Sequence, residues 1–125
     1  MKQIPTISDA ESHVMDRLWL RAPQTAEELA AELGTSQGWQ PSTVKTLLNR
    51  LLYKGAIAAE RDGRRFLYSA VLQRDAWQRN QSVSLIDRLF GGRLAPLVAQ
   101  FASQRKLSKA DIAALKALLK EHGSE

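Results

Sequence analysis

Residues 41–54 carry side chains that suit contact with the edges of nucleic-acid bases. Four apolar side chains have the i, i+3, i+4, i+7 spacing of a helix that buries one face: Val44, Leu47, Leu48 and Leu51. The other side of that helix supplies the candidate contacts, which are Ser42, Thr43, Lys45, Thr46, Asn49 and Arg50. Lysine donates to guanine acceptors, asparagine pairs with an adenine edge, and hydroxyls bond to bases or phosphates. The alternative is an ordinary amphipathic surface helix.

A second group of cations surrounds a sharp turn. Residues 56–61 and 65–70 have the composition of two β-strands, and Asp62-Gly63 between them is a strong signal for a hairpin turn. Three arginines flank that turn: Arg61, Arg64 and Arg65. A guanidinium group presents a planar fork to a phosphate and also fits a narrow minor groove. We therefore expect the hairpin tip to contact a nucleic-acid backbone. The alternative is a solvated turn in which Asp62 neutralises one arginine.

Two capping boxes mark the starts of the helices that must position these candidate contact residues. Ser8 and Glu11 have the spacing at which a hydroxyl and a carboxylate cap the free backbone N–H groups of a helix start. Thr25 and Glu28 repeat that spacing. Each pair predicts a helix that begins directly after its hydroxyl residue, and Pro23 ends the first of these helices.

Glycine and proline mark the remaining helix ends. We expect the second helix to stop at Gly34, with residues 35–40 as a linker. Pro41 suits the first position of the third helix, and Lys54-Gly55 closes it. Three short helices followed by a hairpin are the arrangement of a winged helix-turn-helix.

The remaining residues predict three further helices, over 73–90, over 94–101 and from Ser108 onward. A segment this short struggles to bury its own apolar side chains, so we expect them to lie between two copies of the chain. The candidate dimer contacts are Leu85, Ile86, Leu89, Leu94, Leu97, Val98, Phe101, Ile112, Leu115 and Leu119. The alternative is that this segment packs back onto the first domain.

The predicted fold is mainly α with a small β-hairpin wing. A winged helix DNA-binding domain occupies residues 1–72, and a three-helix dimerisation domain occupies residues 73–125. The net charge of +5 is unevenly distributed along the chain. Residues 1–40 contain three bases and six acids, whereas residues 41–74 contain seven bases and two acids. A basic block favours a polyanionic partner such as double-stranded DNA, although charge alone also fits a solvated surface.

Several function classes are excluded by composition. Cysteine is absent and there are only two histidines, so neither a thiolate nor a histidine-built metal site is expected. We find no glycine-rich phosphate loop and no nucleophile with a base, and we expect no enzyme activity and no cofactor. The N-terminus lacks the apolar stretch of a secretory signal, and no apolar run is long enough for membrane insertion. A cytoplasmic protein is expected.

Three stretches resemble the BlaI/MecI-type penicillinase repressors. They are IPTISDAE at residues 4–11, WQPSTVKTLLNRL at residues 39–51, and GRRFLY at residues 63–68. The family usually has serine or threonine where Gln40 precedes the proline. The resemblance extends over nearly the whole chain, although its motifs are specific only in the first 70 residues or so.

The resemblance implies a homodimeric repressor that binds a palindromic operator. In the β-lactam systems of this family, a membrane sensor-transducer with a metalloprotease domain detects the drug, and the repressor is then cleaved in its dimerisation domain. The matching bond here joins Gln100 to Phe101, where the family usually has asparagine before the phenylalanine. Another branch senses copper through a C-terminal cysteine cluster, which this chain lacks.

The function predicted from sequence is therefore a dimeric DNA-binding transcriptional repressor. An inducing signal, antibiotic or envelope stress, would release it from DNA through proteolysis of the dimerisation domain. One alternative is a winged-helix module that docks a protein, and such a surface should expose apolar anchors on helix 41–54. A second alternative is a repressor that is induced by a small ligand rather than by proteolysis.

Overall fold

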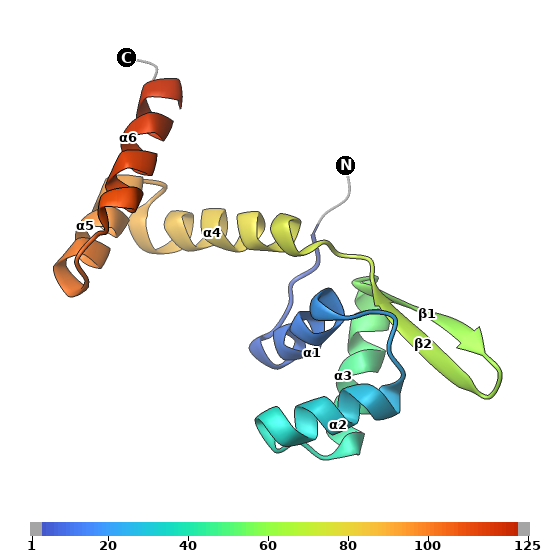
Figure 1. The fold of residues 1–125 in the computed structure, drawn as a ribbon. Helices are drawn as coiled ribbons and strands as arrows, with labels where there is room; N and C mark the ends of the chain where they lie inside the picture. The colour runs from blue at the N-terminus through green and yellow to red at the C-terminus, as the bar shows by residue number, and fades with distance from the viewer. Residues whose placement is uncertain (1–3, 123–125) are drawn as a thin grey trace. The chain divides into compact units, whose positions relative to one another are not determined.

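The computed structural model describes residues 4–122 of the chain. Its elements are α1 (Asp9–Leu20), α2 (Ala26–Gln37), α3 (Pro41–Lys54), β1 (Ile57–Asp62), β2 (Arg65–Ala70), α4 (Arg74–Phe90), α5 (Leu94–Gln104) and α6 (Lys109–His122) (Figure 1). The chain divides into two compact units, one up to Gln81 and one from Ser82 onward. Three helices and a hairpin followed by three helices confirm the predicted fold class.

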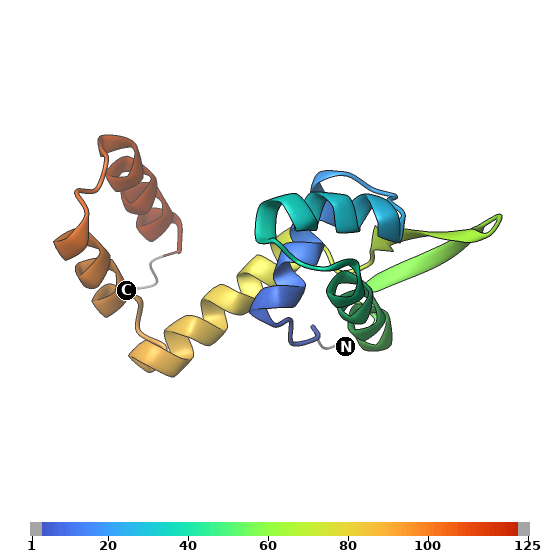
Figure 2. The ribbon, with the colours of Figure 1, turned by 90° about the horizontal axis from the view of Figure 1, so that it is seen from below.

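The first unit is built around one apolar core between α1, α2 and α3, from which the hairpin projects (Figure 2). Each helix buries the apolar stripe that its sequence predicts. The buried apolar side chains of the three helices are Val14, Met15, Leu18, Leu29, Leu33, Val44, Leu47, Leu48 and Leu51. Since α3 is held by one stripe only, its outer face is left free for contacts with another molecule.

Both predicted capping boxes are formed. The Ser8 backbone N–H donates to Glu11 Oε1 over 2.8 Å, and the Glu11 N–H donates to Ser8 Oγ over 3.1 Å. Thr25 and Glu28 make the equivalent pair of bonds, of 2.9 and 3.1 Å. The starts of α1 and α2 are therefore satisfied by the residues that the spacing indicated.

The end of α2 differs from the prediction. The helix does not stop at Gly34 but continues to Gln37, and Gly38 forms the C-cap with a φ of 72°. The Gly38 N–H donates to the Gly34 carbonyl over 3.0 Å. Both glycines suit a helix end by type, but the backbone takes the left-handed conformation only at Gly38. The connection to α3 is therefore shorter than the predicted linker over residues 35–40.

The hairpin pairs β1 and β2 antiparallel, from Ile57 opposite Ala70 to Asp62 opposite Arg65. Its first strand begins one residue later than predicted, because the Ala56 N–H donates to the Leu51 carbonyl and so completes the end of α3. The buried Tyr68 anchors the hairpin to the segment before α2. Its backbone N–H and carbonyl bond to the backbone of Gln24 over 2.7 and 3.0 Å.

The start of α4 belongs to the first unit. Trp77 packs against Trp19 of α1 with the ring centroids 5.5 Å apart, and the Trp19 indole N–H donates to the Leu72 carbonyl over 2.8 Å. The first unit therefore extends to Gln81, beyond the domain boundary expected after residue 72. The first residues of α4 are therefore packed against α1.

The second unit leaves its apolar side chains incompletely covered. None of the residues in α4, α5 or α6 is buried. Of the candidate dimer contacts, Leu85, Leu89, Leu94, Phe101, Ile112 and Leu119 are 36–64% exposed. Ile86, Leu97, Val98 and Leu115 are partly buried. Within the described part of the chain, no helix has both the length and the apolarity needed to cross a membrane.

Candidate nucleic-acid interface

The outer face of α3 holds together all six helix residues predicted to make contacts. The side chains of Ser42, Thr43, Lys45, Thr46, Asn49 and Arg50 are all exposed. Thr46 Oγ1 donates to the Ser42 carbonyl over 3.0 Å, which leaves its oxygen lone pairs free to accept. Between residues 4 and 122, neither Lys45 nor Arg50 forms an ion pair with a carboxylate. Their charges are therefore available to an external anion.

The side chains of these six residues do not all border the same hollow. Lys45 lines a hollow of about 290 Å³ that it shares with Arg64 and Arg65 of the hairpin and with Glu27 of α2. Thr43, Thr46 and Arg50 line a different hollow, of about 330 Å³, on the side that faces α1. The structure thus brings Lys45 and the hairpin arginines together and places Arg50 away from them.

The three hairpin arginines are not equivalent. Arg61 lies over the Phe66 ring, 5.8 Å from its centroid, and its Nε donates to the Gly63 carbonyl over 3.1 Å. Arg65 pairs with Asp62 over 3.3 Å, so one arginine is neutralised within the turn, as the alternative interpretation expected. The Arg64 side chain makes no hydrogen bond or ion pair with the described residues. Arg64 is therefore the hairpin cation best placed to bind a phosphate.

Sequence reasoning missed one residue of this surface. Tyr53 is 94% exposed, although it is a large aromatic side chain. It follows Thr46 and Asn49 by seven and four positions, so it continues the same face of α3 toward the end of the helix. The spacing of α3 indicated this exposure, because position 53 lies outside the buried apolar stripe of the helix. Its phenol group can both donate and accept a hydrogen bond.

A nearly buried ion pair fixes the end of α3. Lys54 Nζ donates to Glu11 Oε1 over 2.5 Å and to the Thr6 carbonyl over 2.7 Å. Glu11 is 1% exposed. Burial raises the pKa of the Glu11 carboxyl, but hydrogen bonds from Lys54 and Ser8 outweigh burial and hold that pKa below its ordinary value. The pair ties the C-terminal end of α3 to the start of α1.

Two further predicted sites lie in the second unit. Gln100 and Phe101, the matching cleavage position, are exposed within α5, and Phe101 is 46% exposed. A mostly apolar hollow of about 400 Å³ lies between α5 and α6, and its lining includes Leu97, Val98, Phe101, Leu115 and one carboxylate, Asp111. Among residues 4–122, no three His, Asp or Glu side chains gather in a way that could hold a metal ion.

Comparison with known proteins identifies the relatives of this chain. A family model described as penicillinase repressor matches residues 7–121. The penicillinase repressor of Bacillus licheniformis is 35% identical over 122 residues, which cover 98% of this chain and 95% of that protein. The methicillin resistance regulatory protein MecI of Staphylococcus aureus strain N315 is 29% identical over 113 residues, which cover 90% of this chain and 92% of that protein.

Solved structures give the same relationship. The DNA-binding domain of the repressor BlaI is 39% identical with a TM-score of 0.54, covering 59% of this chain and 90% of that domain. The monomeric form of Bacillus licheniformis BlaI, solved with the blaP half-operator, is 39% identical with a TM-score of 0.53, covering 60% of this chain and 92% of that one. Because the family model and the Bacillus relative extend over nearly the whole chain, the protein belongs to the penicillinase repressor family.

Proposed function

We propose that this protein is a homodimeric transcriptional repressor that binds a palindromic operator through the outer face of α3 and the tip of the hairpin. The observation that carries the proposal is the exposed polar face of α3, on which neither Lys45 nor Arg50 pairs with a carboxylate of residues 4–122. It lies in a fold shared with a BlaI repressor that was solved on its half-operator. In a winged helix-turn-helix, this helix is the element that enters the major groove.

Different residues take different parts of this task. Lys45 and Asn49 carry the groups that read guanine and adenine edges, and the hydroxyls of Ser42, Thr43 and Thr46 assist at bases or phosphates. Arg50 and Arg64 form no ion pair within residues 4–122, so their guanidinium groups suit phosphates. Phosphate contacts release counterions, so affinity is expected to fall steeply as salt rises.

Repression needs no catalysis, because a dimer that occupies a promoter excludes polymerase. Dimer formation through the uncovered apolar side chains of α4–α6 supplies the second half-site contact. Cleavage between Gln100 and Phe101 would remove part of that surface and release the DNA. A membrane-bound sensor metalloprotease is the partner that the family resemblance suggests for this step.

The experiment that tests the proposal is a selection of genomic fragments by the purified protein, read by sequencing. We expect one enriched palindrome with half-sites about one helical turn apart. Binding without any enriched motif would reduce the protein to a non-specific DNA binder. Absence of binding at low salt would favour the protein-docking alternative, for which Tyr53 is the one large exposed ring on the described outer face of α3.

Lys45 and Arg64 separate base reading from phosphate binding. We expect Lys45→Ala to lose about 1–3 kcal/mol on the operator and less on random duplex, so that specificity relaxes. Arg64→Ala should weaken both duplexes equally and reduce the salt slope by about one. Fluorescence anisotropy on both duplexes at several salt concentrations measures these effects.

Arg65→Ala is the matched comparison and should weaken binding less, since Arg65 is already paired with Asp62. Equal losses on both duplexes for Lys45→Ala would refute its base-reading role.

Tyr53 is expected to add a hydrogen bond from its hydroxyl to the DNA. Tyr53→Phe removes only that oxygen, so operator affinity should fall by a factor of about 2–10, the effect of one hydrogen bond. The midpoint of thermal unfolding should not change, because the ring is 94% exposed. Operator titration of the two proteins decides the matter, and unchanged affinity would remove Tyr53 from the contact surface.

A further inference from the structure

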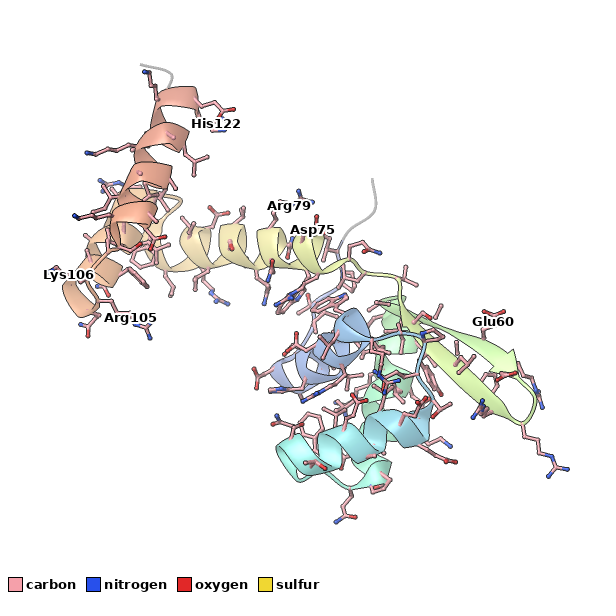
Figure 3. The ribbon with its side chains drawn as sticks, viewed as in Figure 1. Glu60, Asp75, Arg79, Arg105, Lys106 and His122 are labelled. Carbon is pink, nitrogen blue, oxygen red and sulfur yellow. The ribbon has the colours of Figure 1, made fainter. Side chains whose placement is uncertain are left out.

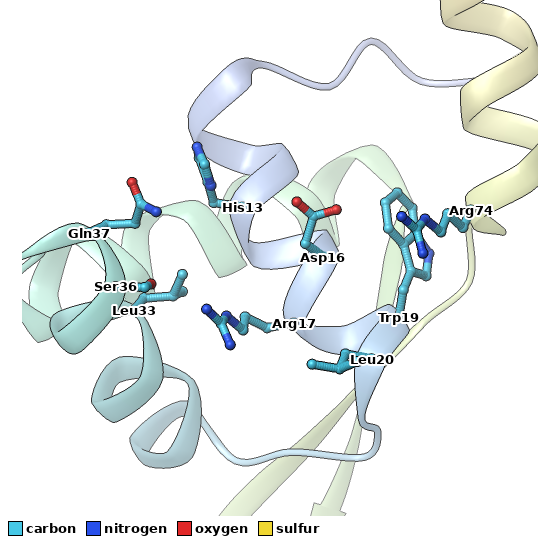
Figure 4. Close-up of a pocket in the computed structure, with 9 residues that line it drawn as sticks. All are labelled: His13, Asp16, Arg17, Trp19, Leu20, Leu33, Ser36, Gln37 and Arg74. Carbon is cyan, nitrogen blue, oxygen red and sulfur yellow. The ribbon is translucent and has the colours of Figure 1, made fainter. Parts of the chain in front are cut away.

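A second hollow lies on the first unit, at a place that the proposed DNA-binding surface does not use. It has a volume of about 420 Å³ and is bounded by α1, the last turns of α2 and the first residue of α4 (Figure 4). No residue of α3 or of the hairpin lines it. We propose that this hollow binds a small organic anion, one that joins a carboxylate or phosphate group to an apolar body.

The charge of the lining favours an anion. Arg17 of α1 and Arg74 of α4 both line the hollow, against a single carboxylate, Asp16. Figure 4 shows the Arg17 side chain extending from α1 toward α2, while the Asp16 carboxylate points away from it. In the described structure neither guanidinium group forms an ion pair with a carboxylate. A carboxylate or phosphate accepts two parallel bonds from a guanidinium fork, so these two cations suit such a group.

A neighbouring arginine, Arg21, has a structural role in this unit and serves as a comparison. Arg21 stands one turn after Arg17 on the same stretch of chain, and it bonds to Glu32 over 2.6 Å and to Glu28 over 3.4 Å. Its charge is therefore used within the fold, to tie the end of α1 to α2. Arg17 and Arg74 both line the hollow, and neither pairs with a carboxylate among the residues that the structure describes.

The rest of the lining favours an organic rather than an inorganic anion. Trp19, Leu20 and Leu33 supply apolar surface, and Leu20 is 78% exposed. The Trp19 ring is held in place by its contact with the Trp77 ring and by its N–H bond to the Leu72 carbonyl. A rigid indole in the same lining as two guanidinium groups is suited to a planar or apolar body that carries an anionic head.

The test uses the full-length protein and four probes: phenyl phosphate, benzoate, inorganic phosphate and benzyl alcohol. Perturbation of backbone and indole N–H signals in two-dimensional NMR locates the binding, and isothermal titration measures it. We expect phenyl phosphate or benzoate to bind saturably with a dissociation constant of about 1 mM, as a fragment of that size does. The perturbed signals should include the Trp19 indole. Inorganic phosphate and benzyl alcohol should bind at least tenfold more weakly, because each lacks one half of the required chemistry.

Variants assign the binding to this hollow. Arg17→Gln and Arg74→Gln, singly, should each weaken the organic anion at least tenfold. Arg79→Gln is the matched control, since Arg79 is an exposed arginine of the same helix α4 that projects from it without lining the hollow (Figure 3). Thermal unfolding curves that coincide with the parent show that a variant is folded. Should one variant fail that check, the other still reports on the site.

Four results of the probe titrations would overturn the proposal. They are no saturable binding of either aromatic anion at 10 mM, on the order of ten times the expected constant; benzyl alcohol or inorganic phosphate binding as tightly; an equal loss in Arg79→Gln; or no loss in Arg17→Gln and Arg74→Gln. Weaker operator binding by Arg17→Gln or Arg74→Gln in the absence of probes would instead assign these arginines to DNA phosphates, and would equally overturn the proposal. The probe titrations do not depend on whether the protein is a repressor.

Discussion

A chain that ends at Gln100 is expected to bind a palindromic operator about 10²–10⁴-fold more weakly than the full chain. The truncated chain lacks Phe101 and all of α6, and with them several of the exposed apolar side chains of the second unit. Without a dimer, the two half-sites are bound independently, and the gain from effective concentration disappears. Anisotropy titrations with an operator duplex measure the change, and sedimentation equilibrium reports the oligomeric state.

A duplex with one half-site is the control for this experiment. Both chains should bind it with equal affinity, because the outer face of α3 and the hairpin lie in the first unit, which is unchanged. Full-length protein with Leu89→Glu and Leu119→Glu supplies a second test without truncation. Both side chains are more than 60% exposed, so their replacement should leave the fold intact while a dimer would separate. Full operator affinity in the truncated chain would contradict the dimeric mechanism.

Much of the fold followed from local chemistry that the sequence displays directly. The capping boxes at Ser8 and Thr25 were readable because both partners lie three residues apart, and the stripe of α3 was readable because its period is regular. The end of α2 was not readable, since Gly34 and Gly38 have the same side chain and differ only in backbone conformation. The tertiary contact of Trp19 with Trp77 was not readable either, because it joins residues far apart along the chain.

The candidate site divides in the same way. Residue type and spacing predicted which side chains of α3 are exposed, but they could not rank the hairpin arginines. That ranking depends on which arginine meets Phe66, which meets Asp62, and which meets neither. Tyr53 was missed because its residue type does not decide its exposure, since tyrosine occurs both inside proteins and at their surfaces. Its exposure in the structure, and not its residue type, assigns Tyr53 to the face of α3 that we propose for DNA binding.

The Glu11–Lys54 pair is expected to have the largest effect on stability of any single polar contact in the first unit. Glu11→Ala removes a buried carboxylate from Lys54, which is itself only 31% exposed, and from the Ser8 cap. Breaking a buried pair by removing one partner typically costs about 3–5 kcal/mol. Urea denaturation followed by circular dichroism measures the loss in the free energy of unfolding.

Glu28→Ala is the matched control for this substitution. Glu28 occupies the same capping-box position in α2, but it is exposed and its arginine partner is more than half exposed. We therefore expect a clearly smaller loss from Glu28→Ala, of the size of an ordinary cap. Comparable losses in the two variants would mean that burial and Lys54 add nothing to the capping interaction.

The pH dependence of stability gives an independent check on the same pair. The pKa of Glu11 is lower in the folded chain than its ordinary value of 4.5, so the unfolded chain binds the proton more readily. The contribution of the pair is thus fully present above pH 4.5 and is lost as the pH falls from that value through the folded pKa. Glu11→Gln cannot titrate, and its unfolding free energy should decline less over this acidic range than that of the parent. Because Lys54 ends the helix whose outer face we assign to DNA, a parent and variant that lose stability in parallel below pH 4.5 would show that other carboxylates, and not this anchor of α3, set the acid limit of the fold.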